Sequence, residues 1–172
     1  EKGVIPIAES SYYLIEPPFQ RLPSGWEDIL FSVAENGSNV ILAHPERCSG
    51  FLEKPHLLES LVSQGIYIQV NLASILGYHG KGSKNLAVRL AEKGLIHFLA
   101  TDSHDPEKRG CDYGSKNIEK LKNLLGEKNF QLLTRDNPAR IIMNKAPVRM
   151  SSIKADAPSK RGFFKRLLNH AR

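Results

Sequence analysis

The chain carries two alternating patterns of apolar and polar positions, which together predict repeated strand–helix units. Four short apolar runs, each bounded by polar or turn-forming residues, have the length of buried strands; these are residues 12–15, 40–43, 66–70 and 96–100. Five other segments carry apolar residues three and four positions apart, which predicts helices; these are residues 26–33, 55–62, 86–91, 118–125 and 136–142. Strands that alternate with helices favour the α/β class.

Glycines mark the ends of the first three predicted helices. Gly37, Gly65 and Gly94 follow these helices directly and lie 28 and 29 residues apart. Glycine readily adopts the left-handed conformation that ends a helix. A strand, a helix and a glycine repeated at this interval predict consecutive βα units, and therefore a parallel sheet.

A polar residue stands at or just after the end of each predicted strand. These residues are Glu16, His44, Asn71 and Asp102. In parallel βα architectures the carboxyl ends of the strands meet at one face, where catalytic sites are built. We therefore expect the four side chains to lie close together.

Two local motifs agree with this expectation, although each alone has a simpler interpretation. Asp102 and His104 form an Asp-x-His pair, whose oxygen and nitrogen donors suit Mn, Zn or Fe; alone, the pair also fits a turn-capping aspartate and a surface histidine. His44 opens the motif His-Pro-Glu-Arg, in which the proline keeps His44 out of helical geometry. Arg47 can hold a phosphate through two parallel hydrogen bonds. Alone, His44 and Arg47 also fit a core histidine and a surface salt bridge.

Glu16 closes an apolar run, where a carboxylate is costly to bury unless it is paired or bound to a metal. A partly solvated strand end is the simpler interpretation of Glu16 alone. Considered together, however, Glu16, His44, Asp102 and His104 are poorly explained as a coincidence of four such simpler cases.

Other groups are not expected to take part in chemistry. His97 lies inside a predicted strand and is interpreted as a packed core histidine, and residues 77–82 are interpreted as a loop. The two cysteines, Cys48 and Cys111, are too few for a disulfide framework and indicate a reducing cytoplasm. Neither cysteine has an arginine six positions later, which a cysteine-based phosphatase needs to hold the phosphate.

Three segments, taken together, resemble one bacterial family; they read Leu-Ala-His-Pro-Glu-Arg (42–47), Gln-Val-Asn (69–71) and Ala-Thr-Asp-Ser-His-Asp-Pro (100–106). The family is that of the manganese-dependent protein-tyrosine phosphatases of capsular and exopolysaccharide synthesis. These enzymes belong to the polymerase-and-histidinol-phosphatase (PHP) superfamily. The resemblance covers about residues 12–147. It implies a distorted βα barrel with a cluster of metal ions, which dephosphorylates the tyrosine kinase of polysaccharide assembly.

The resemblance also implies roles for six residues: metal binding for Glu16, His44, Asp102 and His104, and binding of the substrate phosphate for Arg47 and Arg109. Asn71 matches a family position without an assigned role. The family opens with a His-x-His strand that has no match in this chain. Residues 1–147 are therefore expected to be a phosphatase domain that is incomplete at its N-terminus, with the remaining manganese ligands upstream.

The basic charge is concentrated at the C-terminus. Residues 146–172 carry seven basic residues and one acidic residue, which accounts for the whole net charge of +6. The neutral remainder argues against nucleic-acid binding. Residues 148–172 are expected to be a basic, flexible tail, for which two interpretations stay open. One is a disordered segment; the other is contact of residues 160–172 with anionic lipid at the inner membrane face, through an apolar stripe of Phe163, Phe164, Leu167 and Leu168.

Three functions remain open at this stage. The first is a metal-dependent phosphatase of protein phosphotyrosine, located in the cytoplasm. The second is a PHP-type phosphoesterase that acts on a small molecule, such as histidinol phosphate, or on nucleic acid. The third is a non-catalytic remnant that binds the kinase without turnover.

Overall fold

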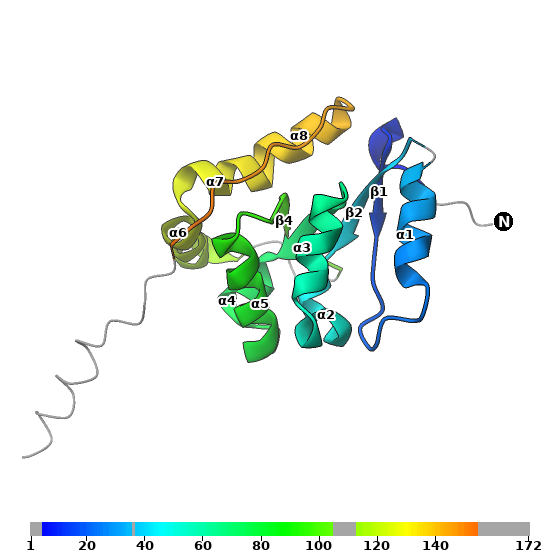
Figure 1. Ribbon diagram of the computed structural model, residues 1–172. Coiled ribbons are helices and arrows are strands. Elements are labelled where there is room, and N and C mark those ends of the chain that lie inside the picture. The colour runs from blue at the N-terminus through cyan, green and yellow to red at the C-terminus, as the bar shows by residue number, and fades with distance from the viewer. Residues whose placement is uncertain (1–4, 36, 105–112, 155–172) are drawn as a thin grey trace, which may run out of the picture.

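The computed structural model describes residues 5–35, 37–104 and 113–154. At its centre is a parallel sheet with the strand order β1–β2–β3–β4 (Figure 1). The strands are β1 (Tyr12–Ile15), β2 (Asn39–Ala43), β3 (Tyr67–Asn71) and β4 (Phe98–Ala100). The predicted α/β class, the parallel pairing and the approximate position of every strand are confirmed.

Helices cover one face of the sheet and enclose the main core. The helices α1 (Trp26–Glu35), α3 (His56–Ser63) and α5 (Gly80–Glu92) follow β1, β2 and β3 in turn (Figure 1). Alternate strand residues point to this face because side chains alternate along a strand. The residues of β2 and β3 that join the main core are Val40, Leu42, Ile68 and Val70.

The predicted helix-ending glycines have the required backbone conformation. Gly37, Gly65 and Gly94 adopt φ values of 75°, 90° and 65°. Gly94 is the most constrained of the three, since a Cβ added there would lie 2.9 Å from the carbonyl oxygen of Met150. The repeated βα organisation therefore follows from the pattern that the sequence displays.

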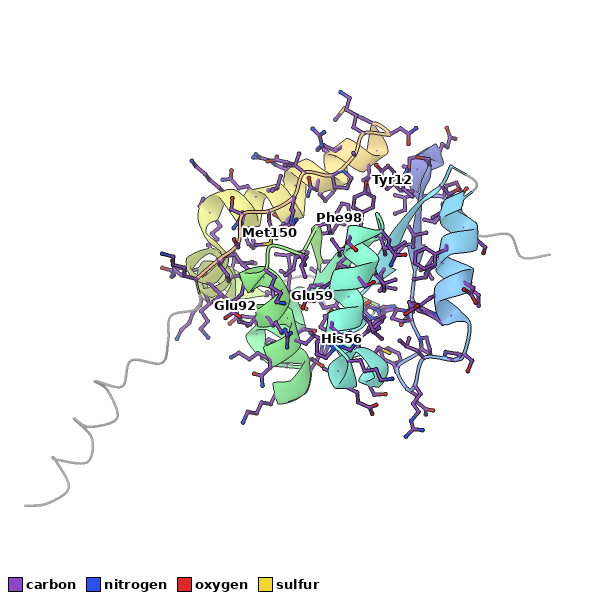
Figure 2. The ribbon with its side chains drawn as sticks, in the orientation of Figure 1. Tyr12, His56, Glu59, Glu92, Phe98 and Met150 are labelled. Atoms are coloured by element: carbon purple, nitrogen blue, oxygen red, sulfur yellow. The ribbon has the colours of Figure 1, made fainter. Side chains whose placement is uncertain are left out.

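The opposite face of the sheet is covered less completely. Tyr12, Ile41 and Phe98 form a small apolar cluster there with Ile141 of α8 (Asn137–Ile142). Figure 2 shows Tyr12 and Phe98 on the side of the molecule where α8 lies. Leu14, two residues after Tyr12 along β1, is 50% exposed. Within the described ranges, β1 has a strand neighbour on one side only.

Short helical segments connect these elements, and the sequence analysis did not predict them; they are η1 (Ile7–Glu9), η2 (Pro45–Arg47), α2 (Ser49–Glu53), α4 (Leu72–Leu76), α7 (Glu127–Gln131) and the π-helical turn η3 (Leu132–Asp136). The helix α6 (Gly114–Leu125) agrees with the predicted segment 118–125. The loop predicted for residues 77–82 is wrong in its second half. Gly77 ends α4 with a φ of 95°, and α5 already begins at Gly80.

The chain packs against the body beyond the predicted boundary at residue 147. Met150 is only 3% exposed and belongs to the main core (Figure 2). The backbone N–H of Val148 donates to Oδ1 of Asn137, at 2.8 Å. Residues 148–151, which the sequence analysis assigned to the tail, are thus part of the packed body. Residues 155–172 lie outside the described residues, so the tail's contact with lipid stays a prediction.

His97 is a packed core histidine, as predicted. Its Nδ1 accepts the backbone N–H of Ile68 at 3.1 Å, and the ring of Tyr67 meets it edge-on at 5.1 Å between centroids. Burial, assisted by the positive charge of Arg149, lowers the pKa of His97 from 6.5 to about 4. The folded protein therefore keeps this imidazole neutral.

This shift makes stability depend on pH. Between about pH 6.5 and pH 4 the unfolded chain binds a proton at His97 that the folded protein does not, so the contribution of His97 to the free energy of unfolding should fall as the pH drops through that window, by up to about 3 kcal/mol. The raised pKa of the buried Glu46 acts in the opposite sense over nearly the same window, so the contribution of His97 is read from the difference between the wild-type protein and a His97 variant. Urea denaturation at pH 7.5 and pH 4.5 measures the change. His97→Gln keeps an acceptor for the N–H of Ile68, and its loss of stability should be smaller. Equal losses in both proteins would contradict the assignment.

Candidate metal centre

The predicted site residues lie at the carboxyl edge of the sheet, where β1 and β2 end side by side. Glu16 follows β1 and His44 follows β2. The parallel register pairs Ile15 with Leu42, which brings these two strand ends together. Oε1 of Glu16 lies 3.3 Å from Nε2 of His44. Glu16 is exposed, whereas His44 is buried.

The backbone at His44 is strained. Its φ and ψ are 32° and 52°, in the left-handed region that non-glycine residues rarely adopt. Pro45 excludes the right-handed helical conformation at the preceding residue. The chain therefore leaves β2 in a sharp turn and enters η2, which directs the imidazole of His44 and the guanidinium of Arg47 to the same pocket.

An aromatic ring joins His44 and Arg47. Phe19 stacks on the imidazole of His44, with the two rings parallel to within 2° and their centroids 5.8 Å apart. The guanidinium carbon of Arg47 lies 4.7 Å from the centroid of the same ring. Such cation–π contact limits the orientations of the guanidinium plane. Sequence analysis did not single out Phe19, because its contacts come from two other segments of the chain.

Asp102 receives two hydrogen bonds on one carboxylate oxygen. Its Oδ2 accepts from Nη1 of Arg47 at 2.8 Å and from Nδ2 of Asn71 at 2.9 Å. Its other oxygen, Oδ1, lies 3.5 Å from Nδ1 of His104. Asp102 has a φ of 55°, so its backbone, like that of His44, lies in the left-handed region.

Burial keeps His44 in the form that can bind a cation. Desolvation lowers the pKa of His44 below its usual value of 6.5, and the nearby carboxylates of Asp102 and Glu16 oppose this shift. The imidazole is therefore neutral at physiological pH and retains a lone pair on one nitrogen. Neutral imidazole is the metal-binding form of histidine.

The six groups define one pocket of about 270 Å³; it is lined by Glu16, Phe19, His44, Arg47, Asp102 and His104. The structure thus brings together the four predicted metal ligands and Arg47. Arg109 lies outside the described residues, and its role stays a prediction. Asn71 is fully buried behind the pocket, where it supports Asp102.

These donors fit a divalent transition metal in type. Two carboxylates and two imidazoles are the oxygen and nitrogen ligands that Mn²⁺, Zn²⁺ or Fe²⁺ accept. They are arranged as two carboxylate–imidazole pairs, Glu16 with His44 and Asp102 with His104. Within the described residues, no three His, Cys, Asp or Glu side chains are gathered closely enough to form a complete metal site. The pocket therefore brings two donor pairs together without a third donor beside either pair in the described residues.

Glu46 is a polar residue of this region that the sequence analysis missed. It is fully buried, and its Oε1 accepts the backbone N–H of Asn71 at 3.0 Å and the hydroxyl of Ser74 at 2.6 Å. Desolvation raises its pKa to about 7, against the effect of these two hydrogen bonds. The sequence signal that could have identified Glu46 is its position between Pro45 and Arg47 in the His-Pro-Glu-Arg motif.

A parallel βα sheet with carboxylates, imidazoles and an arginine at its carboxyl edge is typical of metal-dependent phosphoryl hydrolases. A family model described as "Capsular polysaccharide synthesis, CpsB/CapC" matches residues 1–143. The chain therefore belongs to the CpsB/CapC family of capsular polysaccharide synthesis.

Individual relatives agree with this membership. The tyrosine-protein phosphatase YwqE of Bacillus subtilis is 35% identical over 109 residues, which cover 63% of this chain and 43% of that protein. The tyrosine-protein phosphatase CpsB of Streptococcus pneumoniae is 28% identical over 154 residues, which cover 84% of this chain and 61% of that protein.

A solved structure has the same fold. It belongs to the crystal structures of YwqE from Bacillus subtilis and CpsB from Streptococcus pneumoniae, described as unique metal-dependent tyrosine phosphatases. The TM-score is 0.75 at 30% sequence identity, and the match covers 87% of this chain and 61% of that chain. This chain thus spans between about two fifths and three fifths of the length of the relatives that it matches.

Proposed function

We propose that this chain carries part of the active site of a metal-dependent hydrolase that removes phosphate from protein phosphotyrosine, in the control of capsular or exopolysaccharide synthesis. The observation that carries the proposal is the pocket itself, where two carboxylate–imidazole pairs face an arginine at the carboxyl edge of a parallel sheet. The names of the family and of its tyrosine phosphatase members support the substrate class.

The proposal assigns roles to named residues: metal binding to Glu16, His44, Asp102 and His104, and binding of the substrate phosphate to Arg47 and Arg109. Manganese is the proposed metal. When bound, divalent cations supply Lewis acidity, because they lower the pKa of a bound water and neutralise charge on the phosphate. The guanidinium of Arg47, held between Phe19 and Asp102, is oriented to receive two phosphate oxygens. Phe19 excludes water from one wall of the pocket.

Among the described residues, the pocket offers no cysteine nucleophile. The thiol of Cys48 is buried, and its Sγ lies 3.3 Å from the carbonyl oxygen of Gln20. Cys48 does not line the pocket. The proposed nucleophile is a water molecule, which a bound divalent cation would activate, while Arg47 would orient the ester and stabilise its charge.

The sheet is proposed to be one part of a distorted βα barrel of the PHP type. Two observations support this: β1 is an edge strand of the described sheet, and Leu14 is half-exposed on its incompletely covered face. Further strands would cover both features and supply the remaining metal ligands. This arrangement is compatible with the solved structure, of which the chain covers 61%.

The proposed partner is a bacterial tyrosine kinase of polysaccharide assembly, whose phosphotyrosine is the substrate. A cytoplasmic location is part of the proposal, and the free, buried Cys48 suits a reducing compartment. Among the helices of the described residues, none is long and apolar enough to cross a bilayer. Contact of residues 160–172 with the membrane surface would bring the enzyme close to a membrane-associated substrate.

A substrate panel tests the proposal in the full-length protein. With Mn²⁺, a phosphotyrosine peptide should be hydrolysed with a kcat/KM at least about tenfold above that of a phosphoserine peptide or histidinol phosphate, because aryl phosphate has the better leaving group and suits the Phe19 wall. A chelator should abolish turnover. Faster hydrolysis of histidinol phosphate would favour the small-molecule phosphoesterase. Kinase binding without turnover would favour the non-catalytic remnant.

A further inference from the structure

Glu46 stands out because it is a buried carboxylate that forms no salt bridge within the described residues. Its side chain is 0% exposed, and within the described residues its Oε2 has no hydrogen-bond partner. Its Oε1 accepts from the backbone of Asn71 and from the hydroxyl of Ser74. A buried, incompletely paired carboxylate lowers stability, so stability alone does not account for Glu46.

The hydrogen bonds of Glu46 belong to a closed ring of four residues. Glu46 fixes the backbone of Asn71, whose side-chain amide donates to Oδ2 of Asp102. The same oxygen of Asp102 accepts from Arg47, which is joined to Glu46 by a peptide bond. In such a ring, the place of each member constrains the other three. Only Asp102 and Arg47 line the pocket.

Glu46 also lies at the turn whose backbone is strained. It is two residues after His44, whose left-handed conformation persists only if neighbouring contacts hold it. No side chain caps η2 at His44. The two hydrogen bonds to Oε1 tie η2 to the end of β3 and the beginning of α4, and this connection holds the turn in place.

We propose that Glu46 is a positioning residue of the candidate metal centre. As an acceptor through Oε1, it holds Asn71 so that the Asn71 amide orients Asp102, and it holds η2 so that His44 and Arg47 face the same pocket. Glu46 is not itself a ligand or a proton carrier in this scheme. The inference rests on the proposed function, because the positions of His44, Arg47 and Asp102 matter only if the pocket binds a metal and a phosphate.

The decisive comparison is between two substitutions of similar size in the full-length protein. Glu46→Gln keeps an acceptor at the position of Oε1 and replaces the unpaired Oε2 by an amide NH₂, so its Mn²⁺ affinity and kcat should stay within about threefold of wild type. Glu46→Met keeps the length of the side chain but cannot accept hydrogen bonds, and it should weaken Mn²⁺ binding or lower kcat by about 10- to 100-fold. Calorimetric titration with Mn²⁺ measures the affinity independently of turnover.

A double-mutant cycle tests the route through Asn71. Asn71→Ala removes the side-chain amide that reaches Asp102, while its backbone N–H remains. If Glu46 acts in part through that amide, Glu46→Met should lower kcat by a smaller factor in the Asn71→Ala background than in the wild-type protein, and the remaining factor measures the route through η2. Equal factors in the two backgrounds would exclude the route through Asn71. Glu46→Ala repeats the comparison if the Met variant does not fold.

A destabilised control separates positioning from stability. Asn137 is also fully buried and hydrogen-bonded, to the carbonyl of His97 and to the backbone of Val148. Asn137→Ala should lower the unfolding temperature and leave Mn²⁺ affinity unchanged.

A Glu46→Gln variant as impaired as Glu46→Met would overturn the inference, as would a Glu46→Met variant with normal Mn²⁺ affinity and normal kcat. A wild-type protein that binds Mn²⁺ but hydrolyses no phosphomonoester would instead overturn the proposed function, and the Mn²⁺ titration would still decide the role of Glu46.

Discussion

Replacement of Asp102 by alanine in the full-length protein is expected to lower the rate of phosphotyrosine hydrolysis by roughly 10²- to 10³-fold. Asp102 is the residue on which most contacts of the pocket converge: Arg47 and Asn71 donate to Oδ2, and His104 lies beside Oδ1. Its loss removes one proposed metal ligand and also releases Arg47 from its oriented position. Steady-state kinetics with a phosphotyrosine peptide, and calorimetric titration with Mn²⁺, measure both consequences.

Two comparisons make this result specific. Asp136→Ala removes a carboxylate that is half-exposed and paired with Arg135 outside the pocket, and it should leave kcat unchanged. If Asp102 served only to neutralise the largely buried Arg47, a double variant with Arg47→Met would regain stability, because removal of both charges avoids an unpaired buried cation. The same double variant should not regain phosphatase activity, because Asp102 is also a proposed metal ligand. Activity near the wild-type level in Asp102→Ala would remove Asp102 from the site.

The elements of the fold could be predicted because each one has its own periodic signal. β2 and β3 are buried on both faces and read as largely apolar runs, with Gln69 as the polar exception inside β3, and their helices end at glycines with positive φ. β4 was predicted two residues too long at its start, since Ile96 and His97 are buried without belonging to the strand. The segments α2, α4 and α7 have five residues each, too few to display a helical period.

The position of the site could be predicted from the sequence, but its internal contacts could not. A polar residue after each strand places Glu16, His44 and Asp102 at one edge, because parallel strands share their direction. The stacking of Phe19 on His44 depends on how the connection after β1 folds back, and no local pattern encodes that. Glu46 was overlooked because a charged residue between two functional neighbours is ordinarily expected at the surface. Its burial follows from long-range hydrogen bonds to β3 and α4.

Residues 1–172 alone are expected to bind Mn²⁺ more weakly than the full-length protein and to hydrolyse aryl phosphate more slowly, on the order of 100-fold or more, which is the effect of losing one group that stabilises the transition state. A catalytic metal needs a fixed set of ligands with one open position. Within the described residues the donors form two pairs and no group of three, so neither ion would be held by the protein in a fixed geometry.

The sheet itself gives a second reason for the same result. β1 has an unpaired edge within the described ranges, and Leu14 is half-exposed beside it, so the strand that carries Glu16 to the pocket is supported on one side only. Fluctuation of β1 would move Glu16 relative to His44 and weaken the first pair of donors. The measurement is metal-dependent hydrolysis of a chromogenic aryl phosphate by residues 1–172 and by the full-length protein, with bound manganese quantified in both. Equal turnover and equal manganese content would mean that Glu16, His44, Asp102 and His104 suffice, and that no ligands from outside this chain are needed.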